Sequence, residues 1–227
     1  MYPPEWFFRM QNRSTEDYIK NIYKLQREGE KVTTSALAES LQLSDPSITD
    51  MIKKLSDRGF VRYAPYKGVE LTKDGTSMAM KILRRHRLWE MFLVQHLGYT
   101  WDQIHDEAER LEHVTSDLLE QKLDELLGFP RIDPHGDPIP SVDGRLDHPP
   151  FTALTSCDAG DVVHVLRVSD AEPRILQHAT RLGVGLHTRL VVREKMPFDG
   201  SMTLLLEDRE LFISRDVAEA IFVERIL

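Results

Sequence analysis

The spacing of apolar residues divides the chain into a helical part and a β-rich part. Residues 12–29 place apolar side chains on one face of a 3.6-residue period, with Ser14 as a candidate N-cap and Gly29 after the last turn. The apolar face consists of Tyr18, Ile19, Ile22, Tyr23 and Leu25. This pattern predicts an amphipathic helix.

Two shorter helices and a hairpin are predicted next. Residues 35–41 and 46–57 have helical periodicity, and Pro46 suits a first helical turn because its missing N–H is not needed there. Residues 60–72 then alternate β-branched and aromatic residues around a Lys-Gly turn, which predicts a hairpin. Three helices followed by a hairpin indicate a winged helix-turn-helix.

In a winged helix-turn-helix, the second helix of the pair enters the major groove of DNA. Polar residues at its start would approach base edges, and basic residues would approach phosphates. The base-edge candidates are Ser44, Pro46, Ser47, Thr49 and Asp50. The phosphate candidates are Lys53, Lys54 and Arg58, with Lys67 in the hairpin. The alternative is a helical protein-interaction domain, but the complete order of elements favours double-stranded DNA.

The middle of the chain is helical again. Residues 73–96 predict a long helix, Gly98 predicts a break, and a split near residues 114–116 separates two further helices. The segment LWEMFLVQHLG holds more apolar residues than one helix face needs. This surplus indicates a helical interface, most simply that of a symmetric homodimer.

The last third of the chain has a different residue pattern. Residues 128–150 are dense in Pro, Gly and Asp and lack periodicity, so we interpret them as a linker or a structured loop. Five short β-rich runs and a brief helix near 173–182 then predict a small five-stranded, SH3-like (FeoA-like) barrel. The predicted fold is mainly α with a β-rich C-terminal domain. The predicted domains are 1–72 (winged helix-turn-helix), 73–148 (helical) and 149–227 (barrel).

The net charge of −8 is unevenly distributed over the 227 residues. Residues 1–67 hold 11 Lys and Arg against 9 Asp and Glu, whereas residues 68–148 hold 9 against 16. A mildly basic first third beside an acidic centre is typical of a DNA-binding module joined to a cation-binding module.

Composition also excludes several classes of protein. Cys157 is the only cysteine, which excludes a disulfide framework and a zinc site of clustered thiolates. The sequence has no basic leader followed by an apolar run, and no stretch approaches about 18 consecutive apolar residues. We therefore expect a cytoplasmic protein that has no membrane partner.

Imidazoles and carboxylates recur at helical spacing in the acidic centre. The segments HRLWE and HDEAERLEHV each place such side chains on one helix face. The residues are His86 and Glu90, then His105, Glu109, Glu112 and His113. Imidazole nitrogen and carboxylate oxygen without thiolate suit Mn²⁺, Fe²⁺ and Zn²⁺. Each residue alone suits a solvated surface, but six within 28 residues favour a metal site.

Two other functional classes use similar residues. A metalloenzyme is one, but the His-Glu-x-x-His motif is absent, and Arg110 stands where a Glu-x-x-His pair would need its ligand. No Gly-rich phosphate loop follows a predicted strand, and Cys157 has no patterned His partner. We therefore expect no enzyme. The second alternative is a winged-helix regulator that senses a small organic ligand.

The order of these elements, with RRHRLWEMFLVQHLGYTWDQIHDEAERLEHV in the helical part, resembles the DtxR/MntR (diphtheria toxin repressor) family of metal-dependent transcriptional regulators. The resemblance covers nearly the whole chain from about Asn12. It implies a homodimer that binds an operator, as a repressor of metal-uptake genes. The implied primary metal ligands are Asp17, Glu109, Glu112 and His113. The implied ancillary ligands are His86, Glu90 and His105, completed by barrel residues for which Asp170 and Glu172 are candidates.

The resemblance also bears on the choice of metal. Iron-sensing members have Met and Cys where Asp17 and Glu109 stand here, whereas manganese-sensing members have Asp and Glu. Carboxylates harden a site, so Mn²⁺ is the predicted metal and Fe²⁺ the alternative. Compact two-domain manganese regulators have Glu where this chain has Lys20, which cannot ligate while protonated. The three-domain form with a separate ancillary site fits better.

Overall fold

The computed structural model describes residues 5–27, 29, 31–64, 67–101, 103–147 and 151–226, with side chains from Arg13 onwards. The chain divides into two compact units. Unit 1 consists of Met1–His86, Glu109–Asp117 and Pro140–Leu146, and unit 2 consists of Arg87–Ala108, Leu118–Ile139 and Asp147–Leu227. The helical middle of the chain is thus shared between the units, and the three-way division predicted above stays a prediction.

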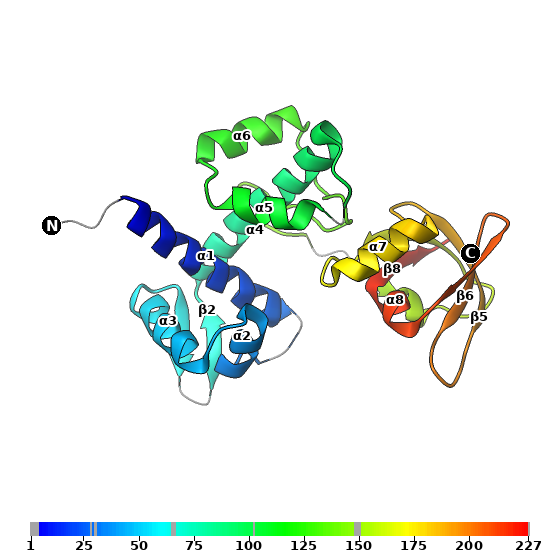
Figure 1. Ribbon diagram of the computed structural model, residues 1–227, viewed down its shortest axis with the longest axis horizontal. Helices are drawn as coiled ribbons and strands as arrows, with labels where there is room; N and C mark the ends of the chain where they lie inside the picture. Colours follow the sequence, from blue (N-terminus) through cyan, green and yellow to red (C-terminus); the bar gives the residue numbers. More distant parts are fainter. Residues whose placement is uncertain are drawn as a thin grey trace. The chain divides into compact units, whose positions relative to one another are not determined.

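Unit 1 begins with three helices and a hairpin, as the sequence predicts. They are α1 (Glu5–Arg27), α2 (Thr34–Leu41), α3 (Asp45–Asp57), β1 (Val61–Ala64) and β2 (Gly68–Leu71). The strands pair antiparallel, and α1 lies across α2 and α3 (Figure 1). The Thr33 side chain caps α2 by accepting from the Ala36 N–H, and Pro46 occupies the first turn of α3.

One correction concerns the start of α1. Ser14 is not the N-cap, because the helix begins at Glu5 and includes both Ser14 and Asp17. No Pro or Gly interrupts residues 5–13, so the helix extends past the predicted start. The apolar face is buried as predicted. Its core consists of Ile19 and Ile22 with Leu37, Ile48, Ile52, Leu55, Val61 and Val69.

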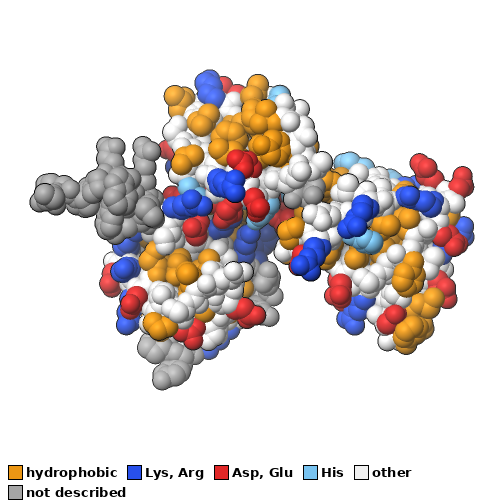
Figure 2. Space-filling model, in the orientation of Figure 1, with side chains coloured by type: hydrophobic (Ala, Val, Ile, Leu, Met, Phe, Trp, Pro, Cys, Tyr) orange, Lys and Arg blue, Asp and Glu red, His pale blue; other side chains and the backbone are white. Residues whose placement is uncertain are grey.

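Three further helices follow the hairpin: α4 (Lys73–Leu97), α5 (Ile104–Glu112) and α6 (Asp117–Leu126). Gly98 follows α4 with a φ of 71°, a left-handed conformation that glycine adopts without strain. Several large apolar side chains around these helices are exposed, and Figure 2 shows hydrophobic side chains gathered over the region of α6. The exposed residues include Leu97, Leu118, Leu119, Leu126 and Phe129.

The Pro-rich segment contains a buried, structured loop. Asp133 and Asp137 are buried, and the Asp133 carboxylate accepts hydrogen bonds from the N–H groups of His135 and Asp137. Gly136 has a φ of 96°, and a Cβ there would lie 2.1 Å from the carbonyl oxygen of Leu166. Only glycine fits this close approach, so the loop has a fixed place against the β-rich domain.

The C-terminal domain is a sheet covered by two helices. Its elements are β3 (Thr152–Ala153), the 3₁₀ turn Leu154–Ser156, β4 (Val162–Val168), α7 (Pro173–Leu182), β5 (Arg189–Lys195), β6 (Met202–Leu206), β7 (Arg209–Ile213), α8 (Arg215–Ala220) and β8 (Ile221–Arg225). The strand order is β3-β8-β4-β5-β6-β7, with antiparallel neighbours. The prediction of five strands was wrong, because the sheet also contains the two-residue strand β3. The helix α8 was not predicted. Both elements are too short to show a period.

Alternating residues of the strands form the core of this domain. The buried positions include Val163, Val165, Leu190, Val192 and Val223. Cys157 is part of the same core and is fully buried. Among the described residues, no helix is long and apolar enough to cross a membrane.

Candidate metal centre and DNA-binding surface

Four residues predicted as primary ligands come together in unit 1. Asp17 lies on α1, Glu109 and Glu112 lie on α5, and His113 follows α5 directly. One ligand atom of each residue lies within 4.8 Å of the ligand atoms of the other three. The sequence spacing of Glu109, Glu112 and His113 puts these three residues on one helix face. The packing of α1 against this face adds Asp17.

Two atoms of this cluster have the environment of a metal ligand. Asp17 Oδ1 and His113 Nε2 are both buried and lie 2.9 Å apart, so each has the other as its polar contact. Both atoms also belong to the group of four ligand atoms that converge within 4.8 Å. The donor set of three carboxylates and one imidazole suits a divalent cation of the Mn²⁺ or Fe²⁺ kind.

Lys20 lies in the same cluster. Its Nζ donates to Glu109 Oε2 at 2.6 Å and to the two carboxylate oxygens of Glu112 at 2.8 and 2.7 Å. The Lys20 side chain is only 3% exposed. The sequence indicated that Lys20 is not a ligand, but it gave no sign of these contacts.

The ammonium group changes the acidity of its neighbours. Burial raises the pKa of Glu109, but the charge and hydrogen bond of Lys20 outweigh it and lower that pKa to about 2. Burial likewise lowers the pKa of Lys20, yet the charges of Glu112 and Glu109 outweigh it and the pKa is raised. Glu109 and Lys20 are therefore both ionised over the physiological range.

Glu16 is a functional candidate that the sequence did not reveal. Its Oε2 lies 2.6 Å from His113 Nδ1, on the ring side away from Asp17. Burial lowers the pKa of His113, but the nearby carboxylates of Asp17, Glu16 and Glu112 raise it to about 9. A carboxylate on the second ring nitrogen orients a ligating histidine. Its position directly before the predicted ligand Asp17 was the one sign of this role in the sequence.

His86 contacts the primary cluster. The sequence grouped it with Glu90 and His105, but within unit 1 its Nδ1 lies 2.5 Å from Glu112 Oε2, 3.7 Å from Glu109 Oε2 and 3.2 Å from Lys20 Nζ. His86 therefore belongs with the polar residues that surround Lys20.

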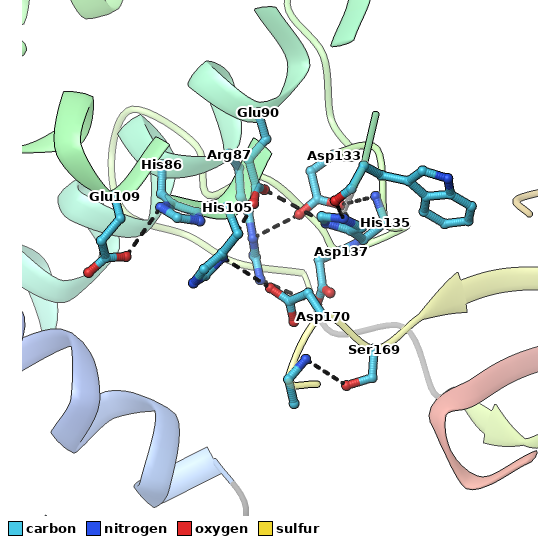
Figure 3. A network of polar contacts seen from close by, with 12 residues as sticks. His86, Arg87, Glu90, His105, Glu109, Asp133, His135, Asp137, Ser169 and Asp170 are labelled. Atoms are coloured by element: carbon cyan, nitrogen blue, oxygen red, sulfur yellow. Dashed lines mark hydrogen bonds and ion pairs between the residues drawn. The ribbon is translucent and has the colours of Figure 1, made fainter. Parts of the chain in front are cut away.

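Three of the predicted ancillary residues come together in unit 2. Ligand atoms of Glu90, His105 and Asp170 lie within 4.8 Å of one another. His105 Nδ1 is 3.7 Å from Glu90 Oε1 and 4.0 Å from Asp170 Oδ2 (Figure 3). Glu172 is not part of this group, because its side chain caps α7 by accepting from the Arg174 N–H.

A second group in unit 2 was not predicted from the sequence. Glu90, Asp133 and His135 are all buried, and their ligand atoms also lie within 4.8 Å of one another. Figure 3 shows Asp133 and His135 facing Glu90 from the buried loop. His135 Nδ1 has no hydrogen-bond partner among the described residues, while Nε2 lies 3.1 Å from the Trp101 carbonyl oxygen. The segment DPHGDP contains these potential ligands, but it has no periodicity from which their arrangement could be predicted.

Arg87 balances part of this acidic group. Its guanidinium lies 3.2 Å from Asp133 Oδ2 and 3.2 Å from Asp137 Oδ1. Burial and the charge of Glu90 nevertheless raise the pKa of Asp133 well above its usual range, against the opposing effect of Arg87. A cation beside Glu90 would lower the pKa of Asp133 and so favour its ionised form, which can ligate a metal.

The predicted DNA-contact residues form an exposed surface on α3 and its flanks. Ser44, Pro46, Ser47, Asp50, Lys53, Lys54, Arg58 and Lys67 are exposed, and Thr49 is partly buried. The Thr49 hydroxyl donates to the Asp45 carbonyl oxygen. Arg58 also has an internal role, because its guanidinium donates to the Thr15 hydroxyl and lies over the Phe60 ring.

A winged helix-turn-helix joined to a helical domain with clustered imidazoles and carboxylates defines the class of metal-responsive DNA-binding regulators. Three family models match the chain: the iron dependent repressor N-terminal DNA binding domain (10–69), the iron dependent repressor metal binding and dimerisation domain (72–141) and the FeoA domain (152–225). The chain belongs to the DtxR/IdeR family of metal-dependent DNA-binding repressors. This membership excludes the metalloenzyme alternative and implies operator binding and dimer formation.

Curated relatives and solved structures match over nearly the whole chain. The iron-dependent repressor IdeR of Mycobacterium tuberculosis is 31% identical over 94% of this chain and 97% of its own length. A manganese-dependent transcriptional repressor in complex with manganese is 40% identical, with a TM-score of 0.86 over 93% of this chain and 100% of that one. ScaR with bound Zn²⁺ is 33% identical, with a TM-score of 0.79 over 93% and 99%.

Proposed function

We propose that this protein is a Mn²⁺-responsive repressor of metal-uptake genes, with Asp17, Glu109, Glu112 and His113 as its primary metal ligands. The observation that carries the proposal is the convergence of their ligand atoms within 4.8 Å. The buried contact of 2.9 Å between Asp17 Oδ1 and His113 Nε2 supports it further, because it brings a ligand atom of α1 to a ligand atom that follows α5. The similar manganese-dependent repressor in complex with manganese supports this choice of metal.

The donor atoms favour Mn²⁺ for a physical reason. Asp17 and Glu109 supply carboxylate oxygen, which suits hard ions, and the clusters found among the described residues contain no thiolate. Affinity order alone places Mn²⁺ last among competing divalent ions, so geometry and metal supply must contribute to selectivity. Fe²⁺ is the second candidate, because the matching family models and IdeR are described as iron-dependent.

We propose a second metal site in unit 2 around Glu90. Glu90 belongs to two groups of candidate ligands. His105 and Asp170 complete one group, and Asp133 and His135 complete the other. His105 and Asp170 are partly exposed, whereas Asp133 and His135 are buried, so the site has a solvated side and an enclosed side. The orphaned Nδ1 of His135 is the atom that most needs a partner.

The primary residues connect the two functional parts of the chain. The proposed domains are 1–72 for DNA binding, 73–148 for metal binding and dimerisation and 149–227 for the β-rich domain. Asp17 belongs to the first and the residues of α5 to the second. A bound divalent ion would supply the positive charge that offsets the mutual repulsion of these carboxylates. Asp17 would then hold α1 to α5, so DNA affinity and metal affinity become linked.

The proposed DNA interface is the exposed surface of α3. Ser44, Pro46, Ser47, Thr49 and Asp50 would face base edges, and Lys53, Lys54, Arg58 and Lys67 would face phosphates. A homodimer would present two such helices to two half-sites, so a palindromic operator is expected. A coupling of about 1–3 kcal/mol would tighten DNA binding roughly 5- to 150-fold on metal addition.

The test is fluorescence anisotropy of a labelled duplex from upstream of the protein's own gene. Protein is titrated anaerobically at fixed salt with Mn²⁺, Fe²⁺, Zn²⁺ or chelator, beside a scrambled duplex, because phosphate contacts make affinity salt-dependent. Stimulation strongest with Mn²⁺ is expected. Asp17→Ala should lose the stimulation and remain dimeric, whereas the exposed α5 control Asp106→Ala should retain it. Unaltered stimulation in Asp17→Ala contradicts the assigned ligand set.

A further inference from the structure

Lys20 presents a cation to the same carboxylates that the proposed function assigns to a metal. Its Nζ lies 2.6 to 2.8 Å from three oxygens of Glu109 and Glu112 and 3.2 Å from His86 Nδ1. An ammonium has three N–H donors, and here all its neighbours are acceptors or ionised groups. The Lys20 side chain is 3% exposed and that of Glu112 is fully buried, so water does little to screen these charges.

The ammonium and a divalent ion cannot share these oxygens. Carboxylate oxygens lie about 2.0–2.2 Å from a bound transition-metal ion such as Zn²⁺, so an ion on Glu109 and Glu112 would lie close to the present position of Nζ. Two cations at that separation repel each other strongly in a buried setting. The flexible four-carbon stem of lysine allows Nζ to leave while the backbone of α1 stays in place.

We propose that Lys20 is an internal counter-ion that a divalent metal must displace from Glu109 and Glu112, so that Lys20 sets the metal concentration at which the protein responds. This inference rests on the proposed function, since it assigns the competitor of the same site. Lys20 stabilises the metal-free form by neutralising two carboxylates, and that stabilisation opposes metal binding. Asp17 lies one turn earlier on α1, so the helix carries both a ligand for the metal and its competitor.

A lysine that competes with the metal differs in its effects from a lysine that only supports the fold. Loss of a supporting lysine lowers stability with or without metal and leaves metal affinity equal or weaker. Loss of a competitor lowers the stability of the metal-free form alone and tightens metal binding, because the unpaired carboxylates attract the ion more strongly. The two roles therefore predict opposite changes in metal affinity.

The experiment compares Lys20→Met with Lys24→Met in the full-length protein. Lys24 is exposed on the next turn of α1 and carries the same charge, so it controls for the general loss of a cation near the cluster. Mn²⁺ affinity is measured by competition with a chelating dye, and thermal unfolding is measured in chelator and in saturating Mn²⁺. Lys20→Met should bind Mn²⁺ at least tenfold more tightly and unfold several degrees lower in chelator. Lys24→Met should change affinity less than threefold.

A second measurement needs no variant and guards against misfolding of Lys20→Met. Reductive methylation of lysine amines, followed by peptide mass spectrometry, reports the access of reagent to Lys20 with Lys24 as the internal standard. Lys20 should react slowly in chelator and several-fold faster in Mn²⁺, because its ammonium moves to solvent. Equal labelling in the two conditions overturns the displacement.

The outcomes separate this inference from the proposed function. Wild-type protein that binds Mn²⁺, with Lys20→Met binding it equally or more weakly, overturns the counter-ion role and leaves the metal site intact. Both the counter-ion role and the metal site are overturned if the wild-type protein binds no divalent metal and Mn²⁺ does not change its unfolding temperature.

Discussion

His113 carries a positive charge in the metal-free protein that it must lose before it can bind a metal. Its pKa of about 9 exceeds the ordinary value of 6.5, because nearby carboxylates outweigh the effect of burial. A group whose folded-state pKa is raised contributes stability that is full below the unfolded pKa and disappears as the pH rises through the folded pKa. The contribution of His113 is therefore lost between about pH 6.5 and pH 9.

The first prediction concerns this pH window. In chelator, the unfolding free energy of the wild type should fall by about 1–3 kcal/mol more between pH 6.5 and 9 than that of His113→Gln. Chemical denaturation at several pH values measures the difference. His96→Gln, which removes an exposed histidine of α4, should retain the wild-type slope. Parallel curves for wild type and His113→Gln would contradict the assignment.

Asp17 and Glu109 carry the second residue-scale prediction. Replacing them together, as Asp17→Met and Glu109→Cys, exchanges two hard oxygen ligands for softer sulfur ligands. The metal ranking in the anisotropy titration should then shift from Mn²⁺ toward Fe²⁺, with Mn²⁺ stimulation reduced at least several-fold. Glu107→Cys provides a thiol on the same helix outside the primary cluster as a control. An unchanged ranking in the double variant means that other residues determine selectivity.

At the scale of elements, α3 combines a buried face and an exposed face. Ile48, Ile52 and Leu55 fix the helix in the core of unit 1, while the polar residues between them face solvent. The buried face determines how α3 is held, and the exposed face determines what it can contact. Phosphate contacts contribute affinity without sequence preference, whereas base-edge contacts discriminate between sequences.

This division of roles gives the third prediction. Lys53→Ala and Lys54→Ala together should weaken binding to the upstream and scrambled duplexes alike, and each lost phosphate contact should reduce the salt slope by about 1. Ser47→Ala should weaken binding to the upstream duplex selectively. Lys122→Ala on α6 is the matched control. Anisotropy at four salt concentrations measures both quantities, and an unchanged slope in the double variant excludes these lysines from the interface.

At the scale of the whole molecule, the exposed leucines of α6 need an explanation. Leu118 and Leu126 are 66% and 59% exposed, and Leu97 and Phe129 are exposed as well. Membership of a family with a dimerisation domain accounts for an apolar surface of this kind. Burial of such side chains between two copies stabilises a symmetric dimer, which in turn places two recognition helices on one operator.

The fourth prediction tests this surface. Leu118→Glu with Leu126→Glu should give monomers in light scattering coupled to gel filtration, because the two charges would be buried at the interface. Operator affinity should fall at least tenfold. Phe198→Glu, at an apolar residue of the β-rich domain that is 84% exposed, should remain dimeric. A dimeric double variant would place the interface elsewhere.

The sequence by itself determined the helices, the hairpin and most strands, because periodicity and helix or turn signals are local. It also determined which residues of α5 share a face, and therefore the grouping of Glu109, Glu112 and His113. Its failures were local as well, since β3 and α8 are too short to show a period, and the Ser14 cap was inferred without the helical residues before it.

Only the tertiary structure decided how distant residues meet. Lys20 and Glu112 are 92 positions apart, and no periodicity links α1 to α5. The loop with Asp133 and His135 reaches Glu90 because Gly136 packs against the Leu166 carbonyl, a contact invisible in a segment without periodicity. A local pattern fixes the face of one element, whereas a metal site depends on which faces pack together. The sequence therefore supplied the donors, and packing assembled them into groups and placed Lys20 among them.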